Sequence, residues 1–304
     1  MTASSEVAID GKRLKLVNLD KVFYPAVGFT KGQVIDYYAR ISKVLLPHLK
    51  DRPLTLKRYP DGVEGPFFYE KRCPEHRPKW VQTAPVWSDD KGDHIQFCLA
   101  NDLATLIWAA NLADLELHTS LSLAKPIEQP TMMAFDLDPG DPADIRDCCA
   151  VAVQLRAVLE QLHLKSFAKT SGSKGLQVYV PLNTPVTYDE TKAFSHAIAQ
   201  VLERANPKGV VSNMKKNLRQ GKVFVDWSQN DQHKTTVCVY SLRAKERPMV
   251  STPVDWDEIK QGIRPKKGKA LAFDSQQALE RAERRGDLFE PVLKLKQRLP
   301  ALST

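Results

Sequence analysis

The stretch Met132-Met133-Ala134-Phe135-Asp136-Leu137-Asp138-Pro139 places two carboxylates two positions apart in a short apolar run. Successive side chains of a β-strand point to opposite faces, so Asp136 and Asp138 share one face while Phe135 and Leu137 share the other. Two carboxylates held that close repel each other unless a cation lies between them. The stretch therefore predicts a strand with one apolar face and one acidic face that binds metal.

A third acid, Asp226, lies in a second β-like run, Val223-Phe224-Val225-Asp226-Trp227. An alternative is that Asp136 and Asp138 are turn residues, because Asp138-Pro139-Gly140-Asp141-Pro142 has turn composition. Asp136, however, precedes that turn, and a buried carboxylate without a partner is energetically costly. With Asp226 counted, the sequence favours a site for divalent metal built from three carboxylates.

The segment Thr170-Ser171-Gly172-Ser173-Lys174-Gly175 is a small-residue loop that carries one lysine. Backbone N–H groups of such a loop, together with one cation, can hold phosphate oxygens. The string is not a Walker A sequence, and a flexible β-hairpin loop is the alternative. Three acids for metal and a phosphate loop together indicate nucleotidyl transfer with two divalent ions.

Composition is consistent with a folded protein that meets polyanions. The chain has 304 residues, is 42% hydrophobic, and carries a formal net charge of +8 with a pI near 9.1. That surplus favours polyanionic partners over membranes. The sequence contains neither a signal-peptide core nor a run of about 18 apolar residues, so we expect a soluble, intracellular protein.

Five cysteines are scattered along the chain, and their odd number argues against a disulfide framework. We therefore expect reduced thiols. Cys73 with His76, and His94 with Cys98, offer a less favoured zinc-binding alternative.

Hydrophobic spacing predicts a mixed α/β chain, of the α+β type, with the acids on a central sheet. Residues up to about 14 are polar and are expected to be loosely held. Helices are predicted over about 30–45, 102–113, 144–162, from 187 to beyond 202, and in a basic peripheral tail over 270–299. Strands are predicted over 53–58, 65–70, 94–99, 115–118, 132–138, 175–182, 222–227 and 235–240, with 175–182 half-buried.

Basic and aromatic side chains form two further candidate groups. Lys57 and Arg58 precede a Pro-Asp-Gly turn, and Phe67 and Phe68 follow it. This pattern suits backbone contact plus base stacking, although a charged pair beside a turn can also be merely solvated. Several basic residues cluster in sequence near Asp226 and suggest a polyphosphate site: Lys215, Lys216, Arg219, Lys222, Lys234 and Arg243.

These strings together resemble the polymerase domain of bacterial DNA ligase D, a branch of the archaeo-eukaryotic primase superfamily. The resemblance spans nearly the whole chain in order. The matching strings are Asp20-Lys21-Val22-Phe23-Tyr24-Pro25, Arg52-Pro53, Lys57-Arg58, Phe67-Phe68, Leu115-Glu116-Leu117-His118, Phe135-Asp136-Leu137-Asp138-Pro139, Thr170-Ser171-Gly172-Ser173-Lys174-Gly175-Leu176, Val225-Asp226-Trp227-Ser228-Gln229-Asn230 and Tyr240-Ser241-Leu242-Arg243.

The resemblance implies a primase-type fold, with mixed and antiparallel sheets flanked by helices. It implies a single polymerase/primase domain over residues 1–304. Within it, an N-terminal module of about 14–125 would pack on a catalytic RRM-like module of about 130–245, followed by a peripheral helical tail of about 250–304.

The resemblance also implies residue roles. Asp136 and Asp138 would bind both metals, and Asp226 would complete the site of the metal nearer the primer 3′-OH. The residues expected to hold or lie near the nucleotide are Lys57, His118, Ser171, Lys174, Arg219, Gln229 and Arg243. Those expected to contact DNA are Lys21 and Lys31, at a downstream 5′-phosphate, and Arg58, Phe67 and Phe68, near the template and nascent pair.

The implied activity is a template-dependent DNA/RNA polymerase and primase that fills gaps and extends 3′ ends at DNA breaks, taking ribonucleotides readily. Two Mn²⁺ or Mg²⁺ ions would be its cofactors. Its partners would be gapped or broken DNA, nucleoside triphosphates, a DNA ligase and a Ku-like end-binding protein, and its location the cytoplasmic nucleoid. Gln177 stands where the family often has histidine. The alternatives are a two-metal nuclease and a catalytically inert DNA-end-binding module.

Overall fold

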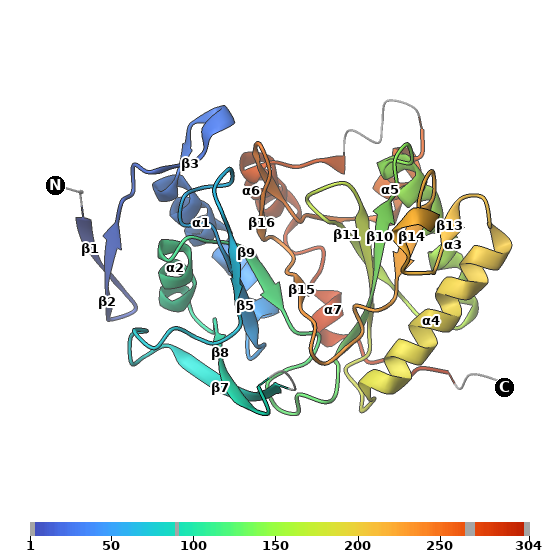
Figure 1. Cartoon of the computed structure of the whole chain (residues 1–304), viewed down its shortest axis with the longest axis horizontal. Helices are drawn as coiled ribbons and strands as arrows, with labels where there is room; N and C mark the ends of the chain where they lie inside the picture. The colour runs from blue at the N-terminus through green and yellow to red at the C-terminus, as the bar shows by residue number, and fades with distance from the viewer. Residues whose placement is uncertain (1–3, 89–90, 265–270, 301–304) are drawn as a thin grey trace. The chain divides into compact units, whose positions relative to one another are not determined.

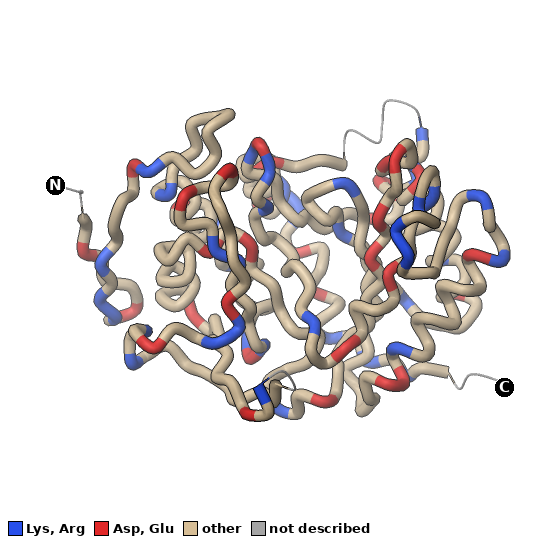
Figure 2. Tube along the Cα trace, viewed as in Figure 1, with Lys and Arg blue, Asp and Glu red and all other residues tan. Residues whose placement is uncertain are grey.

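The computed structural model describes residues 4–88, 91–264 and 271–300, which fall into two compact units (Figure 1). The first unit comprises Met1–Lys125, Thr235–Val250 and Asp274–Gly286. The second comprises Pro126–Lys234, Ser251–Phe273 and Asp287–Thr304. Lys and Arg positions are distributed along the trace of both units and interspersed with Asp and Glu positions (Figure 2).

The first unit is built on a six-stranded antiparallel sheet in the order β15-β9-β5-β8-β7, with β6 paired to β5. The helical elements of this unit are η1 (Pro25–Val27), α1 (Lys31–Leu49), α2 (Leu103–Asn111) and α6 (Ser275–Arg285). Its strands are β1 (Ser4–Ile9), β2 (Lys12–Val17), β3 (Val22–Tyr24), β4 (Phe29–Thr30), β5 (Leu54–Arg58), β6 (Phe68–Glu70), β7 (Gln82–Ser88), β8 (Asp93–Leu99), β9 (Asp114–Thr119), β15 (Thr236–Val237), β16 (Leu242–Ala244) and β17 (Pro248–Val250).

Helix α1 supports this sheet and confirms the helix predicted from Thr30. Thr30 accepts a hydrogen bond from the Gln33 backbone, and the Gln33 side chain accepts one from the Thr30 backbone, which forms a capping box. Two tyrosines of the buried stripe tie the helix to the strands and loops behind it. The Tyr38 hydroxyl donates to the Leu115 carbonyl of β9 at 2.7 Å, and the Tyr37 hydroxyl donates to the Tyr240 carbonyl at 2.7 Å.

The second unit is a six-stranded sheet in the order β13-β14-β10-β12-β11-β18. All neighbouring strands are antiparallel except the parallel pair β13 and β14. Its strands are β10 (Met132–Pro139), β11 (Phe167–Thr170), β12 (Leu176–Pro181), β13 (Val210–Val211), β14 (Val223–Asp226) and β18 (Pro253–Val254). Its helical elements are α3 (Ile145–Gln161), α4 (Tyr188–Ala205), η2 (Lys216–Leu218), α5 (Trp256–Gly262) and α7 (Pro291–Lys294).

Helices α3 and α4 run beside this sheet and cover the apolar face of β10 (Figure 1). Phe135 and Leu137 are fully buried in a core that includes Leu155 of α3 and Phe194 of α4. Burying side chains of that size stabilises the fold by roughly 1.5–3 kcal/mol each. The helices therefore fix which face of β10 remains for the acids.

Several sequence predictions need correction. The segment up to about residue 14 is not loosely held where it is described, because residues 4–14 belong to the antiparallel hairpin of β1 and β2; residues 1–3 of that prediction lie outside the described residues. Strand β12 is buried on both faces rather than half-buried, since Tyr179 packs edge-on against Phe289. The strand predicted over 235–240 is reduced to β15, which pairs with β9. The predicted tail helix starts at Ala270, outside the described residues, and its described part contains two separate helices, α6 and α7.

The prediction that all cysteines are reduced is also wrong, because Cys73 and Cys98 form a disulfide. Cys148, Cys149 and Cys238 are buried thiols. The disulfide takes both thiols of the zinc alternative, and in the described part of the chain no three His, Cys, Asp or Glu side chains are gathered closely enough to form a ready-made metal site. No helix in the described part of the chain is long and apolar enough to cross a membrane.

Candidate active-site residues

Strand pairing brings two of the predicted acids face to face. In the antiparallel pair β10 and β14, Asp136 lies directly opposite Asp226, and Asp138 lies opposite Phe224. Directly opposed residues of an antiparallel pair point to the same face of the sheet. The register of the sheet therefore places Asp226 on the same face as Asp136 and Asp138.

Burial and the neighbouring carboxylates disfavour the ionised form of Asp136. Burial, followed by the charges of Asp226 and Asp138, raises the pKa of Asp136 to about 6 against the opposing effects of Lys169 and Gln177. A bound divalent cation would relieve this repulsion, and carboxylate oxygens are the donors that Mg²⁺ and Mn²⁺ prefer. The residues present therefore fit a divalent metal.

The other two acids already have polar partners. Asp226 accepts hydrogen bonds from the Ser228 backbone at 2.9 Å, the Ser228 hydroxyl at 2.6 Å and the Gln229 amide at 2.7 Å. Asp138 is exposed and lies 3.7 Å from the Arg219 guanidinium. The three carboxylates are thus on one face without being gathered into a ready-made ligand set in the described structure.

The Ser171–Gly175 loop joins β11 to β12 as a hairpin. The Ser171 hydroxyl accepts from the backbone N–H groups of Ser173 and Gly175, at 3.2 and 3.1 Å, and Gly172 has a left-handed φ of +66°. A Cβ on Gly175 would lie 2.0 Å from the Leu137 carbonyl oxygen, so only glycine fits there. The loop is therefore tied closely to the acid-bearing strand, while Lys174 is exposed.

Lys169, a buried lysine close enough to Asp136 to lower its pKa, was not predicted from the sequence. Lys169 is 1% exposed, and its ammonium group donates to Gln177 at 2.5 Å and to Ser251 at 2.7 Å. Gln177 lies opposite Asp136 in the register and hydrogen-bonds its carboxyl. Only Phe167 and Ala168 precede Lys169 as apolar residues in β11, so the sequence carries little signal of its burial.

In the first unit, three residues predicted to bind nucleotide meet at one carboxylate. Lys57 of β5, His118 of β9 and Arg243 of β16 all lie within 3.2 Å of the Glu116 Oε2 atom. No role for Glu116 was predicted from the sequence, although an acid between two leucines, in Leu115-Glu116-Leu117, was a usable signal. The structure thus groups the three predicted nucleotide-binding residues and adds a fourth residue to them.

The predicted aromatic residues are exposed beside these cations. Phe67 and Phe68 are 52% and 44% exposed. The Lys57 ammonium lies 4.5 Å from the centre of the Phe67 ring, and the Arg58 guanidinium lies 5.2 Å from that of Phe68. Arg58 is also paired with Glu70 at 2.8 Å. Exposed rings held by neighbouring cations suit the stacking of bases.

The two lysines predicted at the 5′-phosphate differ in their surroundings. Lys21 is exposed and pairs with Asp61 at 2.8 Å. Lys31 is buried, and its ammonium group donates to the Val17 carbonyl at 2.7 Å. Burial, followed by the nearby charge of Lys21, lowers the pKa of Lys31 to about 8. Because the charge of Lys21 is close enough to lower the pKa of Lys31, the two lysines together suit the binding of an anion.

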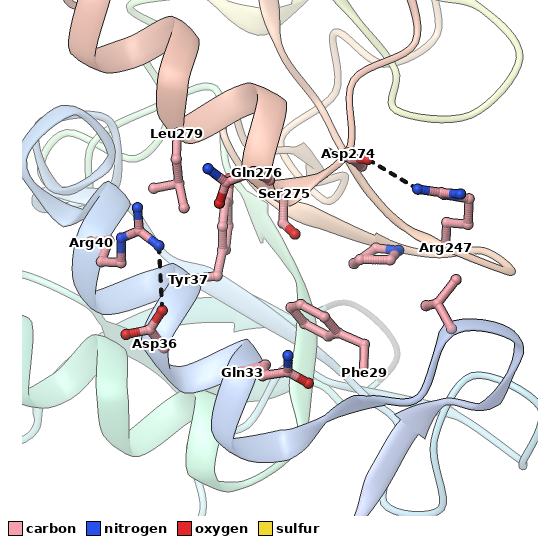
Figure 3. Close-up of a pocket in the computed structure, with 12 residues that line it drawn as sticks. Phe29, Gln33, Asp36, Tyr37, Arg40, Arg247, Asp274, Ser275, Gln276 and Leu279 are labelled. Carbon is pink, nitrogen blue, oxygen red and sulfur yellow. Dashed lines mark hydrogen bonds and ion pairs between the residues drawn. The ribbon is translucent and has the colours of Figure 1, made fainter.

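A separate hollow of about 330 Å³ lies in the first unit between α1, α6 and the η1–β4 turn (Figure 3). Arg40 pairs with Asp36 at 3.7 Å, and Arg247 pairs with Asp274 at 3.2 Å. The two arginines that line the hollow are therefore each paired with an acid that also lines it. None of the described residues that line it was predicted from the sequence to act on nucleotide or DNA.

Comparison with known proteins identifies the family. A sequence model described as "LigD, primase-polymerase domain" matches residues 30–289. The chain belongs to this family. As a LigD primase-polymerase domain it is a nucleotidyltransferase, which favours the polymerase interpretation over the nuclease and the inert binding module.

Relatives of this LigD domain include longer proteins whose names describe them as multifunctional or bifunctional. The chain is 40% identical over 283 residues to the multifunctional non-homologous end joining protein LigD of Mycolicibacterium smegmatis, covering 92% of the chain and 36% of that protein. It is 31% identical over 278 residues to the bifunctional non-homologous end joining protein LigD of Bacillus subtilis, covering 91% and 44%. The chain thus spans less than half the length of these relatives.

The fold of the LigD domain agrees with a solved structure, the polymerase domain of Mycobacterium tuberculosis ligase D in complex with DNA. The TM-score is 0.85 at 37% identity, with 92% of this chain and 98% of that chain covered. The predicted mixed α/β, primase-type fold is confirmed.

Proposed function

We propose that this chain is a template-dependent DNA/RNA polymerase and primase that fills gaps and extends 3′ ends at DNA breaks, with a preference for ribonucleotides. The observation that carries this proposal is the register of β10 and β14, which sets Asp136 opposite Asp226 beside the Ser171–Gly175 hairpin. Family membership supports the reaction class, and the non-homologous end joining relatives support a role at DNA breaks.

The metal site proposed here uses Asp136 and Asp138 for two ions and Asp226 for one of them. When bound, Mn²⁺ or Mg²⁺ would supply charge stabilisation at the α-phosphate and acidify the primer 3′-OH. Ser228 and Gln229 hold the Asp226 carboxylate in place through three hydrogen bonds. Gln177 orients Asp136 from the neighbouring strand.

Nucleotide contacts are proposed for residues in each unit. In the second unit these are Ser171 and Lys174 of the hairpin, with Arg219 and Gln229 near the acids. In the first unit they are Lys57, His118 and Arg243. Cations that meet a transferring phosphoryl group stabilise the charge that develops in the transition state.

DNA contacts are proposed for the exposed face around β5 and β6 and for the two neighbouring lysines. Phe67 and Phe68 would pack on the template and the nascent base pair, with Arg58 at the backbone. Lys21 and Lys31 would bind the 5′-phosphate of the downstream strand. The net charge of +8 favours DNA as the partner and thus the nucleoid as the location, and a DNA ligase and a Ku-like end-binding protein are the proposed protein partners.

The test is extension of a labelled primer on a 5′-phosphorylated gapped duplex with Mn²⁺ and either ribo- or deoxyribonucleotides. Templated addition by the wild type that is lost in the Asp136→Ala/Asp138→Ala variant is expected. Faster addition of ribonucleotides would support the sugar preference. Binding or shortening of the DNA without any addition would contradict the proposal.

A further inference from the structure

Glu116 is a nearly fully buried carboxylate in the middle of the sheet of the first unit. It lies on β9, between β5 and β15, and its side chain is 2% exposed. A buried charge is costly unless it is paired and hydrogen-bonded. The partners of Glu116 therefore explain why the chain retains an acid at this position.

Both oxygens of Glu116 are engaged. Oε2 lies 3.2 Å from the Lys57 ammonium, 3.1 Å from His118 Nε2 and 3.2 Å from Arg243 Nε. Oε1 accepts from the Ala244 backbone N–H at 3.0 Å and from the Tyr59 hydroxyl at 3.4 Å. One carboxylate thus connects side chains from β5, β9 and β16, strands that are distant in sequence.

Three of these partners, Lys57, His118 and Arg243, are the first-unit residues that are proposed above to contact the triphosphate of the nucleotide. Two permanent cations and an imidazole crowded at one point would repel each other without a negative charge between them. Glu116 neutralises one charge and leaves the cluster net cationic. Because a guanidinium or ammonium group has several N–H donors, Arg243 and Lys57 can each bind a phosphate as well as Glu116.

We propose that Glu116 is a positioning residue that gathers Lys57, His118 and Arg243 into one preorganised triphosphate-binding cluster. This inference rests on the proposed function and extends it to a residue that does not itself contact the nucleotide. A site whose cations are already in place spends less binding free energy on ordering flexible side chains.

The environment of Glu116 supports a permanently ionised carboxylate. Burial alone would raise the pKa of Glu116, but the hydrogen bond with His118 and the charges of Arg243 and Lys57 outweigh it and hold the pKa well below its usual range. The carboxylate therefore keeps its charge at any pH at which the enzyme would be assayed.

Three aromatic rings also lie close to the Lys57 ammonium group. The Lys57 ammonium lies 5.3, 4.5 and 5.4 Å from the ring centres of Tyr59, Phe67 and Tyr69. Cation–π attraction of this kind limits the positions that a lysine head group can take. Glu116 and the three rings together hold Lys57 in one place.

The test compares Glu116→Gln with Asp114→Asn. The glutamine side chain would keep the size of the native one but lose its charge, and its amide N–H group would face three donors. Asp114 is a matched control, because it is a fully buried acid two residues away on β9 whose carboxylate accepts from the Lys57 backbone rather than from the cationic head groups.

Two quantities are measured for each variant. One is binding of a fluorescent ribonucleoside triphosphate, and the other is the KM and kcat of primer extension at saturating DNA. Glu116→Gln is expected to weaken nucleotide binding and raise KM about tenfold or more, because charge-assisted hydrogen bonds are lost, while kcat changes by less than about threefold. Asp114→Asn is expected to leave the nucleotide affinity and KM within about twofold of wild type.

A nucleotide affinity of Glu116→Gln within about twofold of wild type would overturn the inference, and so would an equal loss in Asp114→Asn. If Glu116→Gln does not fold, Glu116→Asp replaces it, with an intermediate loss expected because the charge is kept but withdrawn by one methylene. Wild type that binds nucleotide without extending primers would refute the proposed function alone. Wild type that binds no nucleotide would refute both.

Discussion

Replacing Asp136 with asparagine should stabilise the metal-free protein while removing its response to metal. Asp136 lies opposite Asp226, and its pKa is raised by burial and by the two neighbouring acids from the ordinary 3.8 to about 6. A shift of about two units corresponds to about 3 kcal/mol of destabilisation at neutral pH. The partial exposure of Asp136 and its contact with Gln177 reduce the expected gain to about 1–3 kcal/mol.

The sign of the pH dependence follows from the direction of the shift. Between about pH 4 and 6 the folded protein holds a proton on Asp136 that the unfolded chain has released, so the free energy of unfolding falls as pH rises through this window. Asparagine has no such proton. The gain in the free energy of unfolding that Asp136→Asn brings should therefore be small below about pH 4 and complete above about pH 6.

Thermal unfolding in EDTA across about pH 4–7.5, followed by a Mn²⁺ titration at about pH 7, measures both effects. In EDTA at neutral pH the variant should melt roughly 2–6 °C above wild type. Mn²⁺ should then raise the Tm of wild type by mass action and that of the variant far less. Asp189→Asn, at an exposed acid in the first turn of α4, serves as the control and should not raise the Tm.

The reasoning would be refuted if Asp136→Asn melted below wild type at neutral pH in EDTA. It would also fail if the difference persisted undiminished at about pH 4, since repulsion between ionised carboxylates would then not be its source. An equal response of both proteins to Mn²⁺ would remove Asp136 from the metal site.

Three further predictions address the other candidate residues. Asp138→Ala should reduce primer extension, measured in a gel assay, to below a few per cent of wild type, because a metal ligand is lost. DNA affinity should be unchanged, because Asp138 is exposed and supports no core. Substantial residual extension would argue against metal ligation. The preference for a 5′-phosphate gap over a 5′-hydroxyl gap is measured as the ratio of the two Kd values. This preference should decline as pH rises through about 8, because Lys31 loses its charge there. In Lys31→Met the preference should not vary with pH. Phe67→Ala should weaken binding to a template overhang about tenfold by removing one stacking surface, whereas Trp87→Ala, at another exposed ring, should have little effect; equal losses would indicate a general loss of structure.

Local patterns in the sequence predicted helices α1 to α4, the strands that carry most of both sheets and the acidic face of β10, but not β1, β2, β7 or β11. Alternation with a period of two identified β10 and the shared face of Asp136 and Asp138, and hydrophobic spacing predicted helices that begin near Thr30 and residue 187, as α1 and α4 do. The same patterns could not show that β12 is buried on both faces. Periodicity reports which side chains share a face, but it does not report what covers that face.

Residue types and motifs in the sequence indicated the chemical groups of this LigD domain: strand-borne carboxylates, a small-residue loop that carries Lys174, and the pair Phe67 and Phe68 near Lys57 and Arg58. Only the tertiary structure decided which strands and which side chains pair with one another. It paired β15 with β9, joined Cys73 to Cys98, and brought Lys57, His118 and Arg243 onto Glu116. The physical reason is that pairing and burial depend on residues far apart in the chain, whose contacts form only when the sheets assemble.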